Sequence, residues 1–246
     1  MNPNSMIYGA AIWLIPLVIA IVFHEVAHGL AARALGDPTA AERKRLSLNP
    51  IRHVDPIGTV ILPLILALTK MPVFGWAKPV PVNFARLRNP RRDMMLVALA
   101  GPGMNFVLAL VGAVLLGLLL ASAGGGRLGS VGAFVAQNLF NFIGVNLFLA
   151  LFNLIPLPPF DGGHVVQGLL PPAAAERWAS FGRFGFPMLF ILLLVVPTIW
   201  PSAKIVAQLI VPPWQALTEW YLAITTAIAG CCMAGSFSTN RWGSAP

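Results

Sequence analysis

Two histidines and one glutamate lie close together in an apolar stretch near the N-terminus, in the run His24-Glu25-Val26-Ala27-His28. Residues four apart share one face of a helix, so both imidazoles would point toward the same position. Two imidazoles at this spacing suit a tetrahedral zinc ion, whose usual ligands are nitrogen, sulfur and carboxylate oxygen. The motif therefore predicts a zinc site with His24 and His28 as two of its ligands.

The position of this motif inside an apolar stretch strengthens the prediction. A charge at the centre of a membrane helix costs on the order of 2.5 to 3.5 kcal/mol on insertion scales, so such residues usually face a partner or a water-filled cavity. The alternative is that these side chains only join helices by hydrogen bonds. A single serine or asparagine would do that without placing an ionisable carboxylate beside two imidazoles, and we therefore favour the metal site.

A third ligand is required, because a catalytic zinc keeps three protein ligands and leaves its fourth position to water. Asp161 is the best candidate, since it follows a long apolar run and stands in Pro158-Pro159-Phe160-Asp161-Gly162, where regular structure ends and a short carboxylate is free to turn inward. The alternative is a simple helix-ending turn. The other acidic residues outside the histidine motif lie in loops, at a helix start or near the end of the chain: Asp37, Glu42, Asp55, Asp93, Glu176 and Glu219.

The composition indicates the kind of protein that must position these residues. Of 246 residues, 57% are hydrophobic and 10% are charged, and the mean hydropathy is +0.79. Soluble domains carry about 25% charged residues, so a water-soluble globular domain is excluded. The net charge of +8 gives no support to nucleic-acid binding, because the basic residues flank apolar runs as they do in cytoplasmic loops of membrane proteins. We expect an all-α polytopic membrane protein.

The apolar runs set the expected architecture of about five to six transmembrane helices. The long runs cover about 6–32, 90–122, 131–157, 184–200 and 205–229, the last interrupted by Pro212-Pro213. We expect a single transmembrane domain over residues 1–230, with its core in 6–170 and accessory helices in 184–230. The tail, residues 231–246, is expected to be disordered.

A short apolar run between the first two long ones determines the topology. The run from Pro56 to Leu68 is too short for an ordinary span, which needs about 20 residues. Of the 16 lysines and arginines, 11 fall between Arg33 and Arg92, on both sides of this run, so both flanks are expected in the cytoplasm. A re-entrant segment is therefore predicted. It brings Asp161 to the same cytoplasmic side as the histidines, whereas a full span would place Asp161 across the membrane.

The chain from Trp76 to Asn83 is expected to be extended, because its prolines exclude a helix. We expect a short extended or β segment at the membrane surface. The edge of such a segment offers backbone groups to which an unwound substrate could add as a strand. The alternative is a surface loop with only a structural role.

Three motifs together resemble those of the site-2 protease family of intramembrane zinc metalloproteases. They are the His-Glu-x-x-His motif in the first core helix, Gly101-Pro102-x-x-Asn105 in the second, and the run from Asn153 to Gly163 at the end of the third. The resemblance covers roughly the first 170 residues. The extended segment is similar to that of the compact prokaryotic branch, which lacks PDZ and CBS domains.

The resemblance implies a function and assigns roles. It implies zinc-dependent cleavage of transmembrane or juxtamembrane segments of membrane proteins. His24, His28 and Asp161 would hold Zn²⁺ and Glu25 would be the catalytic base. The protein would lie in the bilayer of a prokaryotic inner membrane, with its active site toward the cytoplasm and a membrane-protein substrate as its partner.

Asn153 is a further candidate for catalysis. It lies eight residues before Asp161, and its side-chain amide could donate a hydrogen bond to a developing oxyanion. Hydrogen bonding between helices is an equally good account of this residue, and a better one for Asn105, Asn138, Asn141 and Asn146.

Two other functions remain open at this stage. An ion or metal transporter could use the same cluster as an ion site, and a proteolytically inactive relative could bind membrane proteins without cutting them. A transporter would more naturally show two pseudo-symmetric halves with paired broken helices. The sequence shows one set of motifs without a duplicate, which favours the peptidase.

Overall fold

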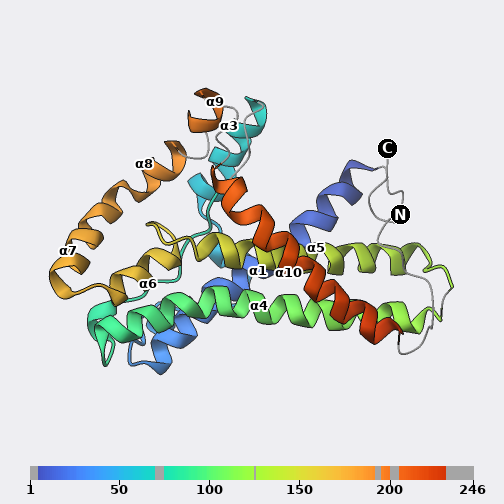
Figure 1. Cartoon of the computed structure of the whole chain (residues 1–246), viewed down its shortest axis with the longest axis horizontal. Helices are drawn as coiled ribbons and strands as arrows, with labels where there is room; N and C mark the ends of the chain where they lie inside the picture. The colour runs from blue at the N-terminus through green and yellow to red at the C-terminus, as the bar shows by residue number, and fades with distance from the viewer. Residues whose placement is uncertain (1–4, 70–74, 125, 192–194, 200–204, 231–246) are drawn as a thin grey trace.

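The structure is a computed structural model that describes residues 5–69, 75–124, 126–191, 195–199 and 205–230. These residues form helices and connecting loops, with no β-strand among them (Figure 1). The long helices are α1 (Met6–Ala34), α4 (Pro90–Ser122), α5 (Ser130–Asn153) and α10 (Ile205–Gly230). Within the described residues, α1, α4 and α5 are long and apolar enough to cross a membrane. The expectation of a helical membrane protein is confirmed, whereas the count of five to six spans stays a prediction.

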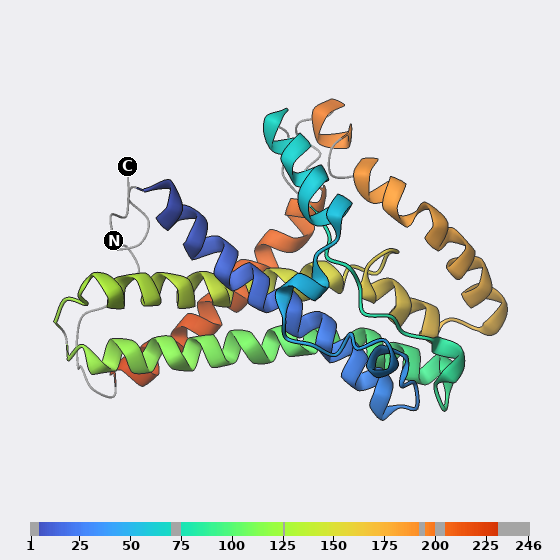
Figure 2. The same cartoon turned by 180° about the vertical axis from the view of Figure 1, so that it is seen from behind.

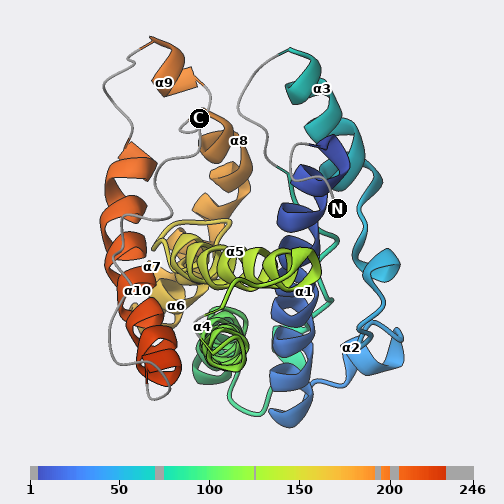
Figure 3. The ribbon, with the colours of Figure 1, turned by 90° about the vertical axis from the view of Figure 1, so that its right-hand side faces the viewer.

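Shorter elements link the long helices. Before α4 they are α2 (Thr39–Glu42), η1 (Pro50–His53), η2 (Pro56–Ile61), α3 (Leu62–Leu68) and η3 (Phe84–Arg86). After α5 they are α6 (Asp161–Leu169), α7 (Pro172–Phe181), η4 (Gly182–Phe184), α8 (Gly185–Phe190) and α9 (Val196–Ile199). The apolar run over 56–68 is thus a short helical piece made of η2 and α3, which projects away from the α4–α5 pair (Figures 1 and 3).

Two sequence expectations differ from the described structure, and a third concerns residues outside it. The segment from Trp76 to Asn83 is extended but pairs with no strand in the described residues. The expected interruption of the last apolar run is wrong, because α10 continues through Pro212 and Pro213. Proline removes one N–H but keeps a helical φ, and apolar helices tolerate it when neighbouring groups satisfy the freed carbonyl. The predicted disordered tail, residues 231–246, lies outside the described residues.

The three membrane-length helices alternate in direction. Contacts between α1 and α4 pair later residues of one helix with earlier residues of the other, and the same holds between α4 and α5. The pairs are His24–Asn105 and His28–Val97 for the first, and Asn105–Asn146 and Gly112–Phe142 for the second. Helices α1 and α5 therefore run in the same direction, with α4 antiparallel to both.

Small residues let α4 pack closely against its neighbours. Ala109 and Ala113 of α4 are buried against Ile143 of α5 and Tyr221 of α10. A Cβ atom on Gly117 would lie 2.8 Å from the Cβ atom of Ile228 on α10. In membranes, where lipid tails are as apolar as leucine, close approach of small residues is a main source of helix association. Helix α10 accordingly crosses the α4–α5 pair in direct contact with it (Figure 1).

A proline inside α1 is compensated by a side chain of α5. Pro16 has no N–H, so the carbonyl of Ile12 one turn earlier lacks its helical donor. The Asn141 side-chain amide donates to that carbonyl at 2.8 Å, and Asn141 is itself buried. This hydrogen bond replaces the missing helical bond and ties α1 to α5.

We predict a coupling between these two positions. Asn141→Leu should destabilise the protein by roughly 1 kcal/mol, because the Ile12 carbonyl would be left unpaired in an apolar environment. In a Pro16→Ala background the new N–H restores the helical bond, so the same Asn141→Leu change should cost less. Unfolding of the four proteins in detergent measures both costs; equal costs in the two backgrounds would contradict this account.

Candidate metal centre

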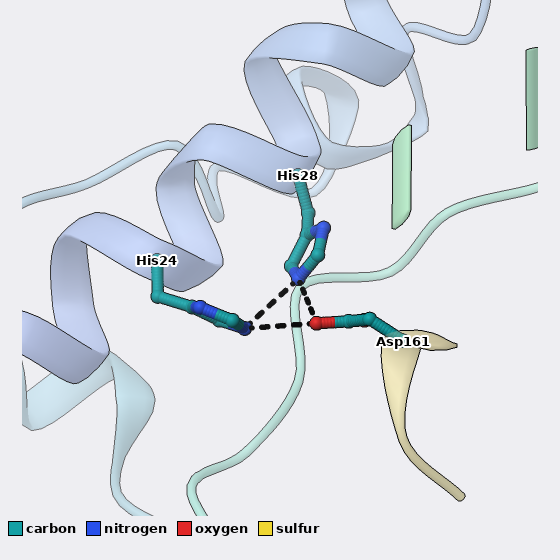
Figure 4. A group of neighbouring side chains, drawn as sticks. All are labelled: His24, His28 and Asp161. Atoms are coloured by element: carbon teal, nitrogen blue, oxygen red, sulfur yellow. Dashed lines mark hydrogen bonds and ion pairs between the residues drawn. The ribbon is translucent and has the colours of Figure 1, made fainter. Parts of the chain in front are cut away.

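The side chains of His24, His28 and Asp161 point toward one another (Figure 4). The two histidines come from adjacent turns of α1, and the aspartate is the first residue of α6. The two Nε2 atoms are 3.1 Å apart. The Asp161 Oδ2 atom lies 3.3 Å from Nε2 of His24 and 3.4 Å from Nε2 of His28. Three donor atoms therefore form a nearly equilateral triangle.

The size and chemistry of this triangle fit zinc. Ligand atoms at 2.0 to 2.2 Å from a tetrahedral ion are separated by about 3.3 to 3.6 Å, close to the observed separations. Two imidazole nitrogens and one carboxylate oxygen are a common donor set of catalytic zinc, which leaves the fourth corner of the tetrahedron to water. The geometry thus brings together the three residues that the sequence suggested as ligands.

Asp161 sits in the first turn of α6, where the positive end of the helix dipole favours an anion. The charged carboxylate is the form that binds a metal.

The chain reaches Asp161 through a compact turn rather than at the end of the preceding helix. Helix α5 ends at Asn153, and α6 begins eight residues later. A Cβ atom on Gly162 would collide with the carbonyl oxygens of Leu154 and Ile155, and one on Gly163 would lie 2.8 Å from the backbone nitrogen of Pro158. The two glycines after the aspartate therefore allow α6 to start directly against this turn.

Gly101 of α4 makes room for the two imidazoles. A Cβ atom at this position would lie 2.6 Å from Cε1 of His28 and 2.7 Å from Cε1 of His24. Both distances are well inside van der Waals contact, so any larger residue would push α4 away or displace the rings. Lack of space beside the two rings thus explains why the Gly101-Pro102-x-x-Asn105 motif begins with a glycine.

Polar groups of α4 orient both histidines. The Nδ1 atom of His24 is 2.6 Å from Oδ1 of Asn105, and Nδ1 of His28 is 2.7 Å from the Val97 carbonyl oxygen. Both partners are acceptors, so each Nδ1 carries the proton and each Nε2 is left with a lone pair for a metal. Ligating histidines in metalloproteins are commonly held in this way.

A second asparagine supports the first. The Asn105 amide donates to Oδ1 of Asn146 on α5 at 2.8 Å, and the Asn146 amide donates to the carbonyl of Phe142. Asn105 and Asn146 are both fully buried. The sequence identified them as links between helices, which they are. It missed that Asn105 also orients His24; its place in the glycine-proline motif was the available signal.

Glu25 follows His24 directly, and its carboxylate contacts the extended segment. Its Oε2 atom accepts a hydrogen bond from the backbone N–H of Val80 at 2.7 Å. The backbone N–H groups of Trp76 and Lys78 donate in the same direction, to the carbonyls of Gly58 and His53. Figure 2 shows this chain running past α1. The extended segment is therefore bound to the protein along one edge, up to the residue beside the predicted ligands.

Asn153, the other candidate for catalysis, and two further polar residues lie elsewhere. Asn153 donates its side-chain amide to the Leu149 carbonyl of its own helix rather than toward the histidines. The ring of His164 packs against Phe84. Asp55 caps η2 by accepting from the N–H groups of Ile57 and Gly58. Of the sequence candidates, only His24, His28 and Asp161 form the described cluster.

Comparison with known proteins gives an independent result. Residues 122–196 match the family model described as Peptidase family M50. The chain is 38% identical over 192 residues to YwhC of Bacillus subtilis (strain 168). The matched residues make up 76% of this chain and 84% of the relative. The chain is 30% identical over 189 residues to Rip2 of Mycolicibacterium smegmatis, 76% of this chain and 66% of the relative.

A third relative comes from another organism. MJ0611 of Methanocaldococcus jannaschii is 33% identical over 167 residues, which is 67% of this chain and 74% of the relative. All three relatives bear the name "Putative zinc metalloprotease". No solved structure gives a significant match. The similarity to YwhC extends over most of both proteins, and with the three apolar helices it identifies this chain as an integral membrane protein that belongs to peptidase family M50, the site-2 protease family.

Proposed function

We propose that this protein is a zinc-dependent endopeptidase that cleaves transmembrane or juxtamembrane segments of membrane proteins. The observation that carries the proposal is the triangle of His24, His28 and Asp161, with Glu25 beside it on a helix long enough to cross a membrane. The names of the relatives and the family membership support the metalloprotease chemistry.

The residues of the site have separable tasks in this proposal. His24, His28 and Asp161 would hold Zn²⁺, which when bound acts as a Lewis acid and makes water acidic enough to attack at neutral pH. Glu25 accepts the proton of the attacking water at one carboxylate oxygen and then delivers it to the leaving amine. The Val80 N–H, bonded to Oε2, keeps that carboxylate from turning freely.

We propose Asn153 as an oxyanion donor that acts only after its present hydrogen bond is broken. Its amide is bonded to the Leu149 carbonyl, so it would have to leave that bond before it could donate to a developing oxyanion. A hydrogen bond that only stabilises the end of α5 is the alternative role, and the described geometry supports that alternative directly.

The helix directions support the proposed topology. Because α1 and α4 are antiparallel and adjacent, the link between them, residues 35–89, begins and ends at the same end of the helix pair. A single crossing within that link is inconsistent with two spanning helices of opposite direction. We therefore propose that η2 and α3 form a re-entrant or interfacial piece, and that the basic link and the metal centre face the cytoplasm of a prokaryotic cell.

The extended segment restricts how a substrate could pair with it. The N–H groups of Trp76, Lys78 and Val80 are already bonded within the protein, and Pro79 and Pro81 have none. An added strand at residues 79–81 would therefore rely on carbonyl acceptors. The bonds to the rest of the protein favour a structural role for this segment. Pairing with a substrate would use only its other edge.

The third ligand is tested by zinc content. Asp161→Asn should lower zinc affinity at least about tenfold, because an amide oxygen is a poorer zinc ligand than a carboxylate. Asp55→Asn is the matched control, since an asparagine oxygen can still accept from Ile57 and Gly58. Metal analysis of the purified variants decides this; equal loss in both, or loss only at position 55, would remove Asp161 from the ligand set.

The Glu25→Gln variant distinguishes a peptidase from an inactive binder and from a transporter. This variant should keep one zinc per chain, since the three ligands remain, and should lose cleavage of a co-reconstituted single-span substrate by roughly 10²- to 10⁴-fold. The amide can still accept from the Val80 N–H but cannot take a proton from water. An inactive binder would not cut even as the unmutated chain, and a transporter would show ion flux without a cut fragment.

The topology is tested by cysteine labelling after Cys231 and Cys232 are replaced by serine. Thiols at the exposed positions Arg43 and Ala85 should react with a membrane-impermeant reagent from the same side, and a thiol at Arg127, in the loop between α4 and α5, should react from the opposite side. Labelling of positions 43 and 85 from opposite sides would mean that residues 56–68 cross the membrane.

A further inference from the structure

A buried carboxylate lies just beyond the end of α1, outside the metal centre. Asp37 has no exposed surface. Its Oδ1 atom accepts from the N–H of Thr39 at 3.0 Å and from the Thr39 hydroxyl, and its Oδ2 atom accepts from the backbone N–H of Asn83 at 2.6 Å. Burial opposes ionisation, but these hydrogen bonds outweigh it and lower the pKa of Asp37. A charged, fully bonded group thus fixes one point of the extended segment.

The other fixed point of the same segment is Glu25. Val80 lies three residues before Asn83, and its N–H donates to Glu25 Oε2 at 2.7 Å. Glu25 is within α1, and Asp37 follows its last residue by three positions. Residues 80–83 are therefore bound at both ends. Val80 donates to the Glu25 carboxylate within α1, and Asn83 donates to the Asp37 carboxylate just beyond the end of α1.

The prolines on either side of Val80 make the register of this segment critical. Pro79 and Pro81 have no N–H, so Val80 supplies the only backbone donor within residues 79–81. If the segment slipped by one residue, a proline would face Glu25 and its carboxylate would lose the bond. The Val80 side chain is also buried, and a Cβ atom on Gly29 of α1 would lie 2.8 Å from it.

We propose that Asp37 is a positioning residue for the reaction: by holding the N–H of Asn83 it sets the register in which Val80 holds the Glu25 carboxylate. This inference rests on the proposed function, in which Glu25 is the base. With Oε2 bonded to Val80, the carboxylate turns less freely, and the proposed base needs its other oxygen to face the attacking water. Misplacement of a catalytic group by about 1 Å can cost on the order of 10²-fold in rate.

The first test is a double-mutant cycle between Asp37→Asn and Val80→Pro. Asparagine replaces one of the two carboxylate oxygens with an NH2 group, so it cannot accept from Thr39 at one position and from the Asn83 N–H at the other. Val80→Pro removes the N–H that donates to Glu25, and Val80→Ala, which keeps the N–H but loses buried side-chain contact, measures how much of the loss comes from packing alone. Glu42→Gln is the control for Asp37, because Glu42 pairs with Arg86 at the exposed side of the same loop.

The expected result is a loss in kcat with little change in KM. Asp37→Asn and Val80→Pro should each lower kcat about tenfold or more at full zinc content, while KM stays within about twofold. Glu42→Gln should stay near the unmutated rate, and Val80→Ala should lose less than Val80→Pro. Because Asp37→Asn and Val80→Pro act through one bond, the double variant should lose no more than the worse single variant. Losses that multiply, or a rise in KM with unchanged kcat, would overturn the proposal.

Hydrogen exchange tests the same inference without reference to cleavage. The backbone amides of Val80 and Asn83 should exchange faster in Asp37→Asn than in the unmutated chain, and Glu42→Gln should leave them unchanged. Unchanged exchange in Asp37→Asn would contradict the proposal that the Asp37 carboxylate fixes the extended segment. If exchange responds but the unmutated chain cuts no substrate, the proposed function fails while the structural coupling stands.

A milder pair of substitutions at Thr39 tests the same role if the Asp37→Asn variant does not fold. Thr39→Val removes the hydroxyl that donates to Asp37 and keeps the shape of the side chain, whereas Thr39→Ser retains the hydroxyl. Thr39→Val should lower kcat and loosen residues 80–83, and Thr39→Ser should restore both. Equal behaviour of the two variants would contradict the proposed role of the Asp37 carboxylate.

Discussion

The close approach of α4 to α1 at Gly101 is the constraint on which the metal centre depends. Only a residue without a Cβ atom fits against both imidazoles, and only at this separation do Val97 and Asn105 reach the Nδ1 atoms of the histidines. The same surface of α4 that leaves space for the rings therefore also supplies the acceptors that orient them. A wider separation between α1 and α4 would remove both effects together.

Three buried side chains, those of His24, Asn105 and Asn146, form a hydrogen-bonded chain that connects three helices. Asn105 joins His24 of α1 to Asn146 of α5, so the helix that precedes Asp161 is linked to the helix that carries the histidines. In an apolar environment an unpaired amide is costly, which makes such a chain specific as well as stabilising. The arrangement fixes which helix faces meet, and with them the positions of His24, His28 and Asp161.

The sequence predicted the parts of the site that follow from local spacing and from topology. The four-residue interval placed His24 and His28 on one face, and the charge distribution placed Asp161 on their side. The acceptor for His24 and the bond from Val80 to Glu25 could not be predicted, because each joins segments dozens of residues apart whose relative depth is set by packing. The course of α10 through Pro212-Pro213 was missed because local propensity argues against it, while tertiary contacts allow it.

The bond between Asn141 and Ile12 has a consequence for how the protein responds to its lipid surroundings. It joins α1 and α5, which run in the same direction, at the end of the helices away from the metal centre. A change in hydrocarbon thickness is met by tilting of the spanning helices. With α1 and α5 joined at that end and again through the buried asparagines, a tilt would carry the histidines and Asp161 as one body, so bilayers of different thickness would move the metal centre in depth without changing the distances between its ligands.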